Sequence, residues 1–198
     1  MTTISDQNTE RQYYIDWLRI ILFSTCFLMI LCMFILPAFS VPEYSIIGNT
    51  LNELGAQSAP NAWIMNLIFI MLGFGSVVAG WKYFDGFLFH RIILGLFCIS
   101  LILMALFNQA PVSPDIGYNK LEDGWNAYFT ATASISFIIL SFATSFIMER
   151  QRDRIISLTV GISAVFLSVL MSEAHQFAGI LQRLQFVISF GWIIYNFK

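Results

Sequence analysis

Residues 20–36 read IILFSTCFLMILCMFIL and contain no charged side chain. Five more apolar segments follow, and the six expected helices run over residues 17–39, 62–81, 91–110, 125–148, 155–171 and 180–197. Because about 20 apolar residues span the hydrocarbon core of a bilayer, each segment is long enough, or nearly so, to cross a membrane. Their apolar residues lie all round the helix, as burial in lipid requires. The sequence therefore predicts an all-α bundle of six transmembrane helices.

The composition also favours a membrane protein. Hydrophobic residues make up 58% of the 198 residues and charged residues 11%, whereas a soluble chain averages about 25% charged residues. Such a composition excludes disorder, collagen and a disulfide scaffold as descriptions of the whole chain. The net charge of -2 provides no basic field for nucleic acid. We expect a short cytoplasmic tail, residues 1–16, and one transmembrane domain, residues 17–198.

The basic residues predict the orientation of the bundle. Six crossings place both termini and the second and fourth loops on one side of the membrane. That side would hold eight of the ten Lys and Arg residues, namely Arg11, Arg19, Lys82, Arg91, Arg150, Arg152, Arg154 and Lys198. The other side would hold Lys120 and Arg183. Since positive residues mark the cytoplasmic side, we expect a multi-pass protein of the cytoplasmic membrane with both termini inside.

The first outer loop, residues 40–61, contains no Lys or Arg. Thr50 and Glu53 have the spacing of a capping box, in which each side chain satisfies a free backbone N–H. Gly55 suits the end of the resulting short helix. We expect this helical turn to cover part of the outer mouth of the bundle. Asn49, Asn52 and Glu53 are then either local capping groups or ligand-binding groups.

Polar residues lie at similar depth in the outer halves of four helices. They are Asn66, Asn108, Gln109, Asn126, Gln182, Arg183 and Gln185. Amides in hydrocarbon need partners, so these side chains should face the interior of the bundle. Two interpretations stay open. The residues form a polar pocket that opens outward, or they form interhelical hydrogen bonds of roughly 0.6 kcal/mol each.

Arg183 is the most informative single residue. It lies near the start of the last helix, where the positive end of the helix dipole disfavours a cation. Glu173 has the opposite problem at the end of the fifth helix. We therefore expect Arg183 to pair with Glu53 or Glu173. In a pocket, Arg183 would supply charge for an anionic ligand, and Asn52, Asn66 and Gln182 would orient it.

The sequence does not favour a catalytic or metal centre. The chain has two histidines, His90 and His175, and they are expected on opposite faces of the membrane. One histidine on each face is too few for a zinc site. His175 is the outer histidine available to activate a serine, and no nucleophile-elbow pattern is present. We expect no metal, no cofactor and no nucleic-acid partner. The lipid bilayer and a lipid or small anionic ligand are the expected partners, and the oligomeric state stays open.

Two motifs resemble a known family. The first comprises Tyr44-Ser45, the run from Asn49 to Ala56, Pro60 and Met65-Asn66; the second is Gly179-Ile180-Leu181-Gln182-Arg183. Together they resemble the domain of unknown function 998 family, which are small six-helix membrane proteins of bacteria and archaea. The resemblance implies that Glu53, Asn66, Gln182 and Arg183 occupy positions that belong to the motifs of this family. The chain departs from the family at Asn108-Gln109, where an acidic residue is common, and at Trp125-Asn126, where a histidine is common.

These observations favour a non-enzymatic membrane protein whose outward-facing polar pocket binds a small anionic molecule or a lipid headgroup. The candidate ligand-binding residues are Asn49, Asn52, Glu53, Asn66, Asn108, Glu173, His175, Gln182 and Arg183. One alternative is a membrane-embedded lipid hydrolase with Glu53, Glu173 or His175 as the base. A second alternative is a structural or partner membrane protein whose polar groups only fix the packing.

Overall fold

The computed structural model describes the backbone of residues 4–197 and the side chains of residues 20–197. The elements are α1 (Ile4–Ile35), η1 (Leu36–Phe39), α2 (Leu51–Leu54), α3 (Ala62–Tyr83), α4 (Leu88–Leu106), α5 (Lys120–Ile147), α6 (Gln151–Glu173), η2 (His175–Phe177) and α7 (Ala178–Asn196). No strand occurs among residues 4–197. Six helices are long and apolar enough to cross a membrane. The predicted all-α, six-span fold class is confirmed.

Five of the six long helices begin earlier than the sequence suggested, and two of them do so by five residues or more. The first begins at Ile4, because no glycine or proline interrupts residues 4–35. The expected tail, residues 1–16, is therefore helical from Ile4 on, and its remaining residues lie outside the described part of the chain. The fourth span begins at Lys120 instead of Trp125. The Asn119 side chain accepts hydrogen bonds from the backbone N–H groups of Leu121 and Glu122, and so caps α5.

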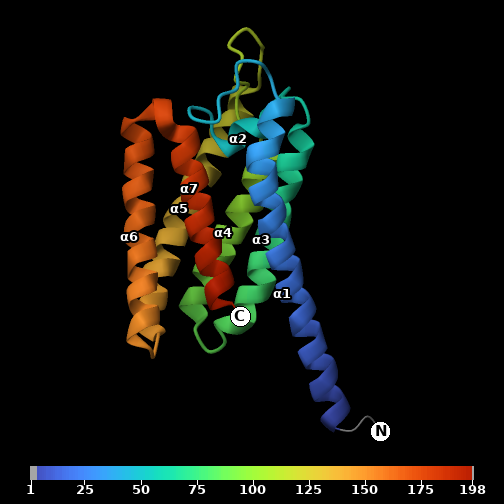
Figure 1. The fold of residues 1–198 in the computed structure, drawn as a ribbon, viewed down its shortest axis with the longest axis vertical. Helices are drawn as coiled ribbons and strands as arrows, with labels where there is room; N and C mark the ends of the chain where they lie inside the picture. The colour runs from blue at the N-terminus through green and yellow to red at the C-terminus, as the bar shows by residue number, and fades with distance from the viewer. Residues whose placement is uncertain (1–3, 198) are drawn as a thin grey trace.

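The long helices pack in the order of the chain. Contacts join α1 to α3, α3 to α4, α4 to α5, α5 to α6 and α6 to α7, whereas α5 and α7 hardly touch. The start of α1 and the end of α7 lie at one end of the bundle, here called the termini end (Figure 1). The loops over residues 40–61 and 107–119 lie at the opposite end, the loop end, where α2 sits beneath the loops. α1 also contacts α7, whereas α5 and α7 face each other without close packing.

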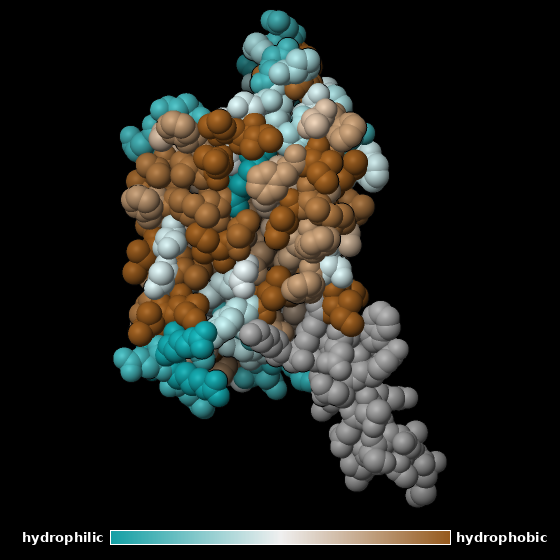
Figure 2. Space-filling view, viewed as in Figure 1, coloured by the Kyte–Doolittle hydropathy of each residue, from teal (hydrophilic) through white to brown (hydrophobic). Residues whose placement is uncertain are grey.

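The surface of the bundle is that of a membrane protein. A broad hydrophobic belt separates hydrophilic ends (Figure 2). Phe34, Phe74, Phe146 and Phe166 are among the large side chains exposed on it. An apolar surface of this extent is unstable in water, so the chain is a multi-pass membrane protein.

The described basic residues keep the distribution expected from the sequence. The ends of α3 and α5 and the starts of α4 and α6 carry Lys82, Arg91, Arg150, Arg152 and Arg154 at the termini end. The side chains of Arg11 and Arg19, and residue Lys198, lie outside the described part of the chain. The positive-inside rule predicts that the termini end faces the cytoplasm.

Candidate functional site

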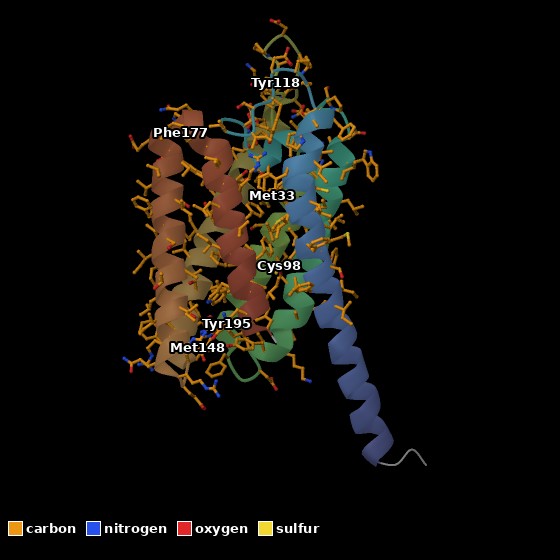
Figure 3. All side chains as sticks on the ribbon, in the orientation of Figure 1. Met33, Cys98, Tyr118, Met148, Phe177 and Tyr195 are labelled. Carbon is orange, nitrogen blue, oxygen red and sulfur yellow. The ribbon has the colours of Figure 1, made fainter. Side chains whose placement is uncertain are left out.

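Arg183 is buried on the side of α7 that faces α1, with 3% of its surface exposed. Its guanidinium donates to the carbonyl oxygens of Met33, Ile46, Asn49 and Gly179 at 2.8–3.1 Å, and to the Tyr44 hydroxyl at 2.8 Å. Met33 lies on α1 in the half of the bundle nearest the loops (Figure 3). Arg183 therefore joins α1, the first loop and α7 through one planar group.

The carbonyl of Met33 needs this partner. In an α-helix, that carbonyl would accept from the N–H four residues later, at position 37. Position 37 is a proline, which has no N–H to donate. The Arg183 Nε–H donates to the Met33 carbonyl oxygen at 3.1 Å instead. A buried carbonyl oxygen without a hydrogen-bond donor raises the free energy of the folded state, so this bond stabilises the end of the first span.

The expected ion pair of Arg183 with Glu53 or Glu173 is wrong. Among the described residues, neither carboxylate lies within 4.0 Å of the guanidinium, and the ion pair that does form joins Arg91 to Asp85 at 2.7 Å. Glu173 is exposed at the end of α6. The reason is that the first loop folds back over α7, and its backbone oxygens reach the guanidinium before any carboxylate does.

Glu53 orders the loop around Arg183. The predicted capping box of Thr50 and Glu53 is confirmed, and Gly55 ends the short helix α2 as expected. The Glu53 carboxylate accepts from the Thr50 backbone N–H and hydroxyl, and from the Asn49 side-chain amide at 3.0 Å. This bonding fixes the stretch whose Asn49 carbonyl accepts from Arg183. We call Tyr44, Asn49, Thr50, Glu53 and Arg183 the loop latch.

Tyr44 links the two halves of the loop latch. Its hydroxyl accepts from Arg183 and donates to the Thr50 carbonyl oxygen at 2.8 Å. Burial raises the pKa of the Tyr44 phenol, and the Arg183 guanidinium opposes that rise. The phenol is therefore protonated at neutral pH and can donate to Thr50 while it accepts from Arg183.

Gly179 lets the loop rest on α7. A Cβ at this position would meet the Asn49 carbonyl oxygen and would lie 2.6 Å from the Ile46 carbonyl oxygen. The next residue, Ile180, donates its backbone N–H to the Ile47 carbonyl oxygen at 3.1 Å. The loop latch is thus closely packed as well as extensively hydrogen-bonded.

A cavity of about 80 Å³ lies on the other side of α7, among α4, α5 and α7 beneath α2. We call it the chamber. Its polar lining residues are Asn52, Thr130, Ser134, Gln182, Gln185 and Ser189. Its apolar walls include Phe97, Phe137, Phe186 and Phe190. Among the described residues that line it, none is ionisable.

Two amide oxygens in the chamber lining have no hydrogen-bond partner among the described residues. They are Oδ1 of Asn52 and Oε1 of Gln185, both on side chains that are more than nine-tenths buried. The nitrogens of the same amides do have partners, since Asn52 donates to Thr130 at 2.8 Å and Gln185 to Ser168 at 3.3 Å. Leaving such an acceptor unpaired costs about 1–3 kcal/mol, so a hydrogen-bond donor placed in the chamber would be favoured.

The chamber opens into a cleft of about 810 Å³ between α5 on one side and α6, η2 and α7 on the other. The two share Asn52, Thr130, Ser134, Met171 and Gln182 as lining residues. The cleft lining runs from Asp123 to Ile138 on α5, about 22 Å by helical rise. Ile135 at its edge is 58% exposed on the hydrophobic belt. The cleft therefore connects the loop end, the hydrocarbon and the chamber.

A family model described as protein of unknown function (DUF998) matches residues 25–195. The chain belongs to this family. The matched region includes the loop latch, the chamber and the cleft of this DUF998 chain. No curated protein and no solved structure matches the chain.

Eight of the nine predicted site residues of this DUF998 chain divide into three groups, and the ninth, Glu173, lies exposed at the end of α6. Asn52 and Gln182 line the chamber, and His175 lines the cleft. Asn49, Glu53 and Arg183 belong to the loop latch and line neither space, whereas the loop-latch residue Thr50 lines the cleft. Asn66 donates to Asn108 at 3.0 Å and to the Gly55 carbonyl oxygen at 3.2 Å, so these two residues join the loops.

The hydrolase alternative requires a base in contact with a nucleophile. Among the described residues, no hydrogen bond joins His175 or Glu173 to a serine or threonine hydroxyl; the nearby Ser172 hydroxyl donates to the Val169 carbonyl oxygen at 2.7 Å. The Glu53 carboxylate accepts from the Thr50 hydroxyl at 2.9 Å, but it also accepts from the Thr50 backbone N–H, as the carboxylate of a capping box does. No group of three described His, Cys, Asp or Glu residues could hold a metal ion. The cleft therefore offers hydrogen-bonding and apolar surfaces to a ligand, and the described residues show neither an assembled histidine–hydroxyl pair nor a metal-binding group in it.

Sequence reasoning missed how far the polar lining extends. Asn126, Thr130 and Ser134 follow one another at spacings of four residues on α5, and Gln182, Gln185 and Ser189 repeat at helical spacing on α7. Side chains at these spacings share one face of a helix. Pairing the two stripes would have identified the chamber. Asn126 itself donates to the Met104 and Phe107 carbonyl oxygens at 2.8 and 2.7 Å and so completes the end of α4.

Proposed function

We propose that this membrane protein binds a lipid or a small amphiphile non-covalently, with the polar part of the ligand in the chamber. The observation that carries the proposal is the connection of a buried, incompletely hydrogen-bonded chamber to the hydrophobic belt through the cleft. Ligand sites are concave and mostly apolar, with a few polar groups that fix orientation. The chamber and the cleft together have this character.

The cleft favours entry of the ligand from the membrane. Ile135 and Ile138 line the end of the cleft farthest along α5 from the loop end, and Ile135 is exposed on the lipid-facing surface of α5. An apolar tail can lie against these residues while the attached polar group reaches Asn52 and Gln182. Asp123 and His175 line the same cleft and lie beside the loop end. The proposal includes the cytoplasmic membrane as the location and the cytoplasm as the side of both termini.

Arg183 is not part of the proposed ligand site. The sequence suggested that it would attract an anionic ligand, but its donors are occupied by backbone oxygens and the Tyr44 hydroxyl. It lines neither the chamber nor the cleft. The proposal therefore retains binding of a lipid or small molecule and assigns Arg183 to the support of the loop.

Native mass spectrometry of the protein purified in a mild detergent tests the proposal. We expect the wild type to retain lipid, and Ser134→Phe, which fills the junction of chamber and cleft, to lose it. Ile139→Phe is the matched control, because Ile139 lies on the same helix but lines neither space. Equal retention by Ser134→Phe and Ile139→Phe would contradict the proposal, as would a wild type that takes up no added lipid.

A further inference from the structure

We infer that the chamber selects an uncharged lipid headgroup that carries hydroxyl groups, in preference to a phosphate or carboxylate. This inference rests on the proposed function and specifies its ligand. Three observations carry it: the charge of the chamber wall, the orientation of its free hydrogen-bonding atoms, and its aromatic walls.

The chamber has no group that could neutralise an ion. No described residue in its lining is ionisable. The nearest buried cation, Arg183, follows Gln182 in α7 but points to α1, where backbone oxygens and Tyr44 occupy its donors. Burying an anion without a counter-ion or a set of donors is strongly unfavourable. A charged headgroup would therefore lose its hydration and gain little in return.

The free atom of Asn52 is an acceptor, and its orientation follows from its neighbours. Asn126 donates through its Nδ2 to two backbone carbonyl oxygens, and this fixes its Oδ1 toward Thr130. The Thr130 hydroxyl proton has two acceptors, that oxygen at 3.5 Å and the Met104 sulfur at 3.9 Å. The Thr130 oxygen accepts from the Asn52 Nδ2 at 2.8 Å. Oδ1 of Asn52 then remains without a partner in the chamber lining.

Gln185 presents a second free acceptor to the ligand. The side-chain oxygen of Gln182 is not free, because it already has a donor in the protein. Oε1 of Gln185 is buried without a partner, while its nitrogen donates to Ser168. Oε1 of Gln182 already accepts from the Leu51 backbone N–H. The two free acceptors require donors from the ligand, and the Nε2 of Gln182, which has no hydrogen bond among the described residues, requires an acceptor. A hydroxyl group supplies both, whereas a carboxylate supplies only acceptors and a phosphate mainly acceptors at neutral pH.

Phenylalanine rings form the apolar walls of the same chamber. Phe97 lies 5.7 Å from Phe137 and 6.2 Å from Phe190 between ring centroids, and Phe186 stacks on Phe190 at 5.8 Å. These walls suit the carbon skeleton of a glycerol or sugar. Diacylglycerols and glycosylated diacylglycerols share the required chemistry, since both present free hydroxyl groups next to an apolar chain.

A matched pair of lipids tests the inference. Dioleoylglycerol and dioleoyl-phosphatidic acid differ by one hydroxyl in place of a phosphate. Each is titrated separately against the purified protein in detergent, and the bound fraction is measured by native mass spectrometry. We expect dioleoylglycerol to bind at least tenfold more tightly than phosphatidic acid. A glucosylated dioleoylglycerol, titrated in the same way, shows whether glycerol or sugar hydroxyls are preferred.

Substitutions at the two acceptors complete the test. Asn52→Leu and Gln185→Leu remove the free oxygens at nearly constant volume, and each should weaken binding of the preferred neutral lipid three- to tenfold. Gln176→Leu is the control, because Gln176 is exposed and lines neither space. Melting curves of all variants verify that they are folded.

The outcomes separate the two proposals. Phosphatidic acid binding as tightly as the neutral lipids, with loss in Ser134→Phe, would overturn the headgroup inference and leave the proposed function intact. Unchanged affinity for the neutral lipids in both leucine variants would also overturn the inference. No binding of any of the three lipids would overturn the proposed function itself.

Discussion

The loop latch and the chamber lie on opposite sides of α7, and they differ in whether their buried polar groups have hydrogen-bond partners. The loop latch holds a full charge, and that charge has hydrogen-bond partners on three elements. The chamber holds no charge, and two of its amide oxygens have no partner in the protein. Adjacent residues on α7, Gln182 and Arg183, thus belong to different environments. Burial of a polar residue in a membrane helix is by itself a weak reason to propose a ligand; an unpaired atom that faces a cavity is a stronger one.

Removal of the guanidinium should have the largest effect on stability. We expect Arg183→Leu to lower the free energy of unfolding by about 3 kcal/mol or more, because it leaves several buried carbonyl oxygens without a donor. Unfolding in a detergent mixed with increasing dodecyl sulfate measures the change. Arg154→Leu is the control, since Arg154 is exposed and has one long contact of 3.4 Å. Similar losses in both variants would mean that the loop latch does not stabilise the fold.

A methyl group at Gly179 should have the next largest effect. We expect Gly179→Ala to destabilise the protein by about 1–3 kcal/mol, because the new Cβ would overlap backbone oxygens of the first loop. Gly191→Ala on the same helix is the matched comparison, because nothing lies within 4 Å of a Cβ there. Gly191→Ala should be neutral or stabilising by up to about 1 kcal/mol. The contrast between the two alanines, measured by the same unfolding assay, isolates the packing of the loop on α7.

Glu53 should contribute less than Arg183, although both belong to the loop latch. We expect Glu53→Ala to cost about 1 kcal/mol, the usual effect of a lost helix cap. The midpoint of thermal unfolding should fall accordingly, and trypsin or chymotrypsin should cleave the first loop faster. A loss as large as that of Arg183→Leu would show that Glu53 compensates the buried charge directly.

A substitution in the chamber should affect lipid retention more than stability, which is the opposite of what we expect for the loop latch. We expect Gln185→Leu to change the free energy of unfolding by less than about 1 kcal/mol, because it removes an acceptor that has no protein partner and one long hydrogen bond of 3.3 Å to Ser168. Retention of co-purified lipid should fall in the same variant. A large loss of stability with unchanged lipid retention would place Gln185 with the structural residues and reverse the comparison.

The sequence predicted the fold well because hydrocarbon imposes simple rules. Apolar length identified all six spans, and the local spacing of Thr50 and Glu53 identified α2. The errors lie at helix starts such as Lys120, where the cap at Asn119 rather than hydropathy decides the boundary.

The candidate site was less predictable because its contacts are long-range. The partners of Arg183 are backbone oxygens up to 150 residues away in the chain, and no side-chain pattern reports them. The carboxylate partners suggested by charge alone were therefore wrong. The chamber depends on how two helices that hardly touch, α5 and α7, face each other across α4, and periodicity within one helix does not give that pairing.

The bond between Arg183 and the Met33 carbonyl oxygen has a consequence for biogenesis. Chains enter the membrane from the N-terminus, so the first span is inserted well before the ribosome has made the last one. Pro37 leaves the end of that first span without its backbone donor until Arg183 arrives on the sixth span. We expect a product truncated before the final helix to leave the Met33 carbonyl oxygen without the donor that Arg183 supplies. The last helix made thus contributes a bond to the end of the first.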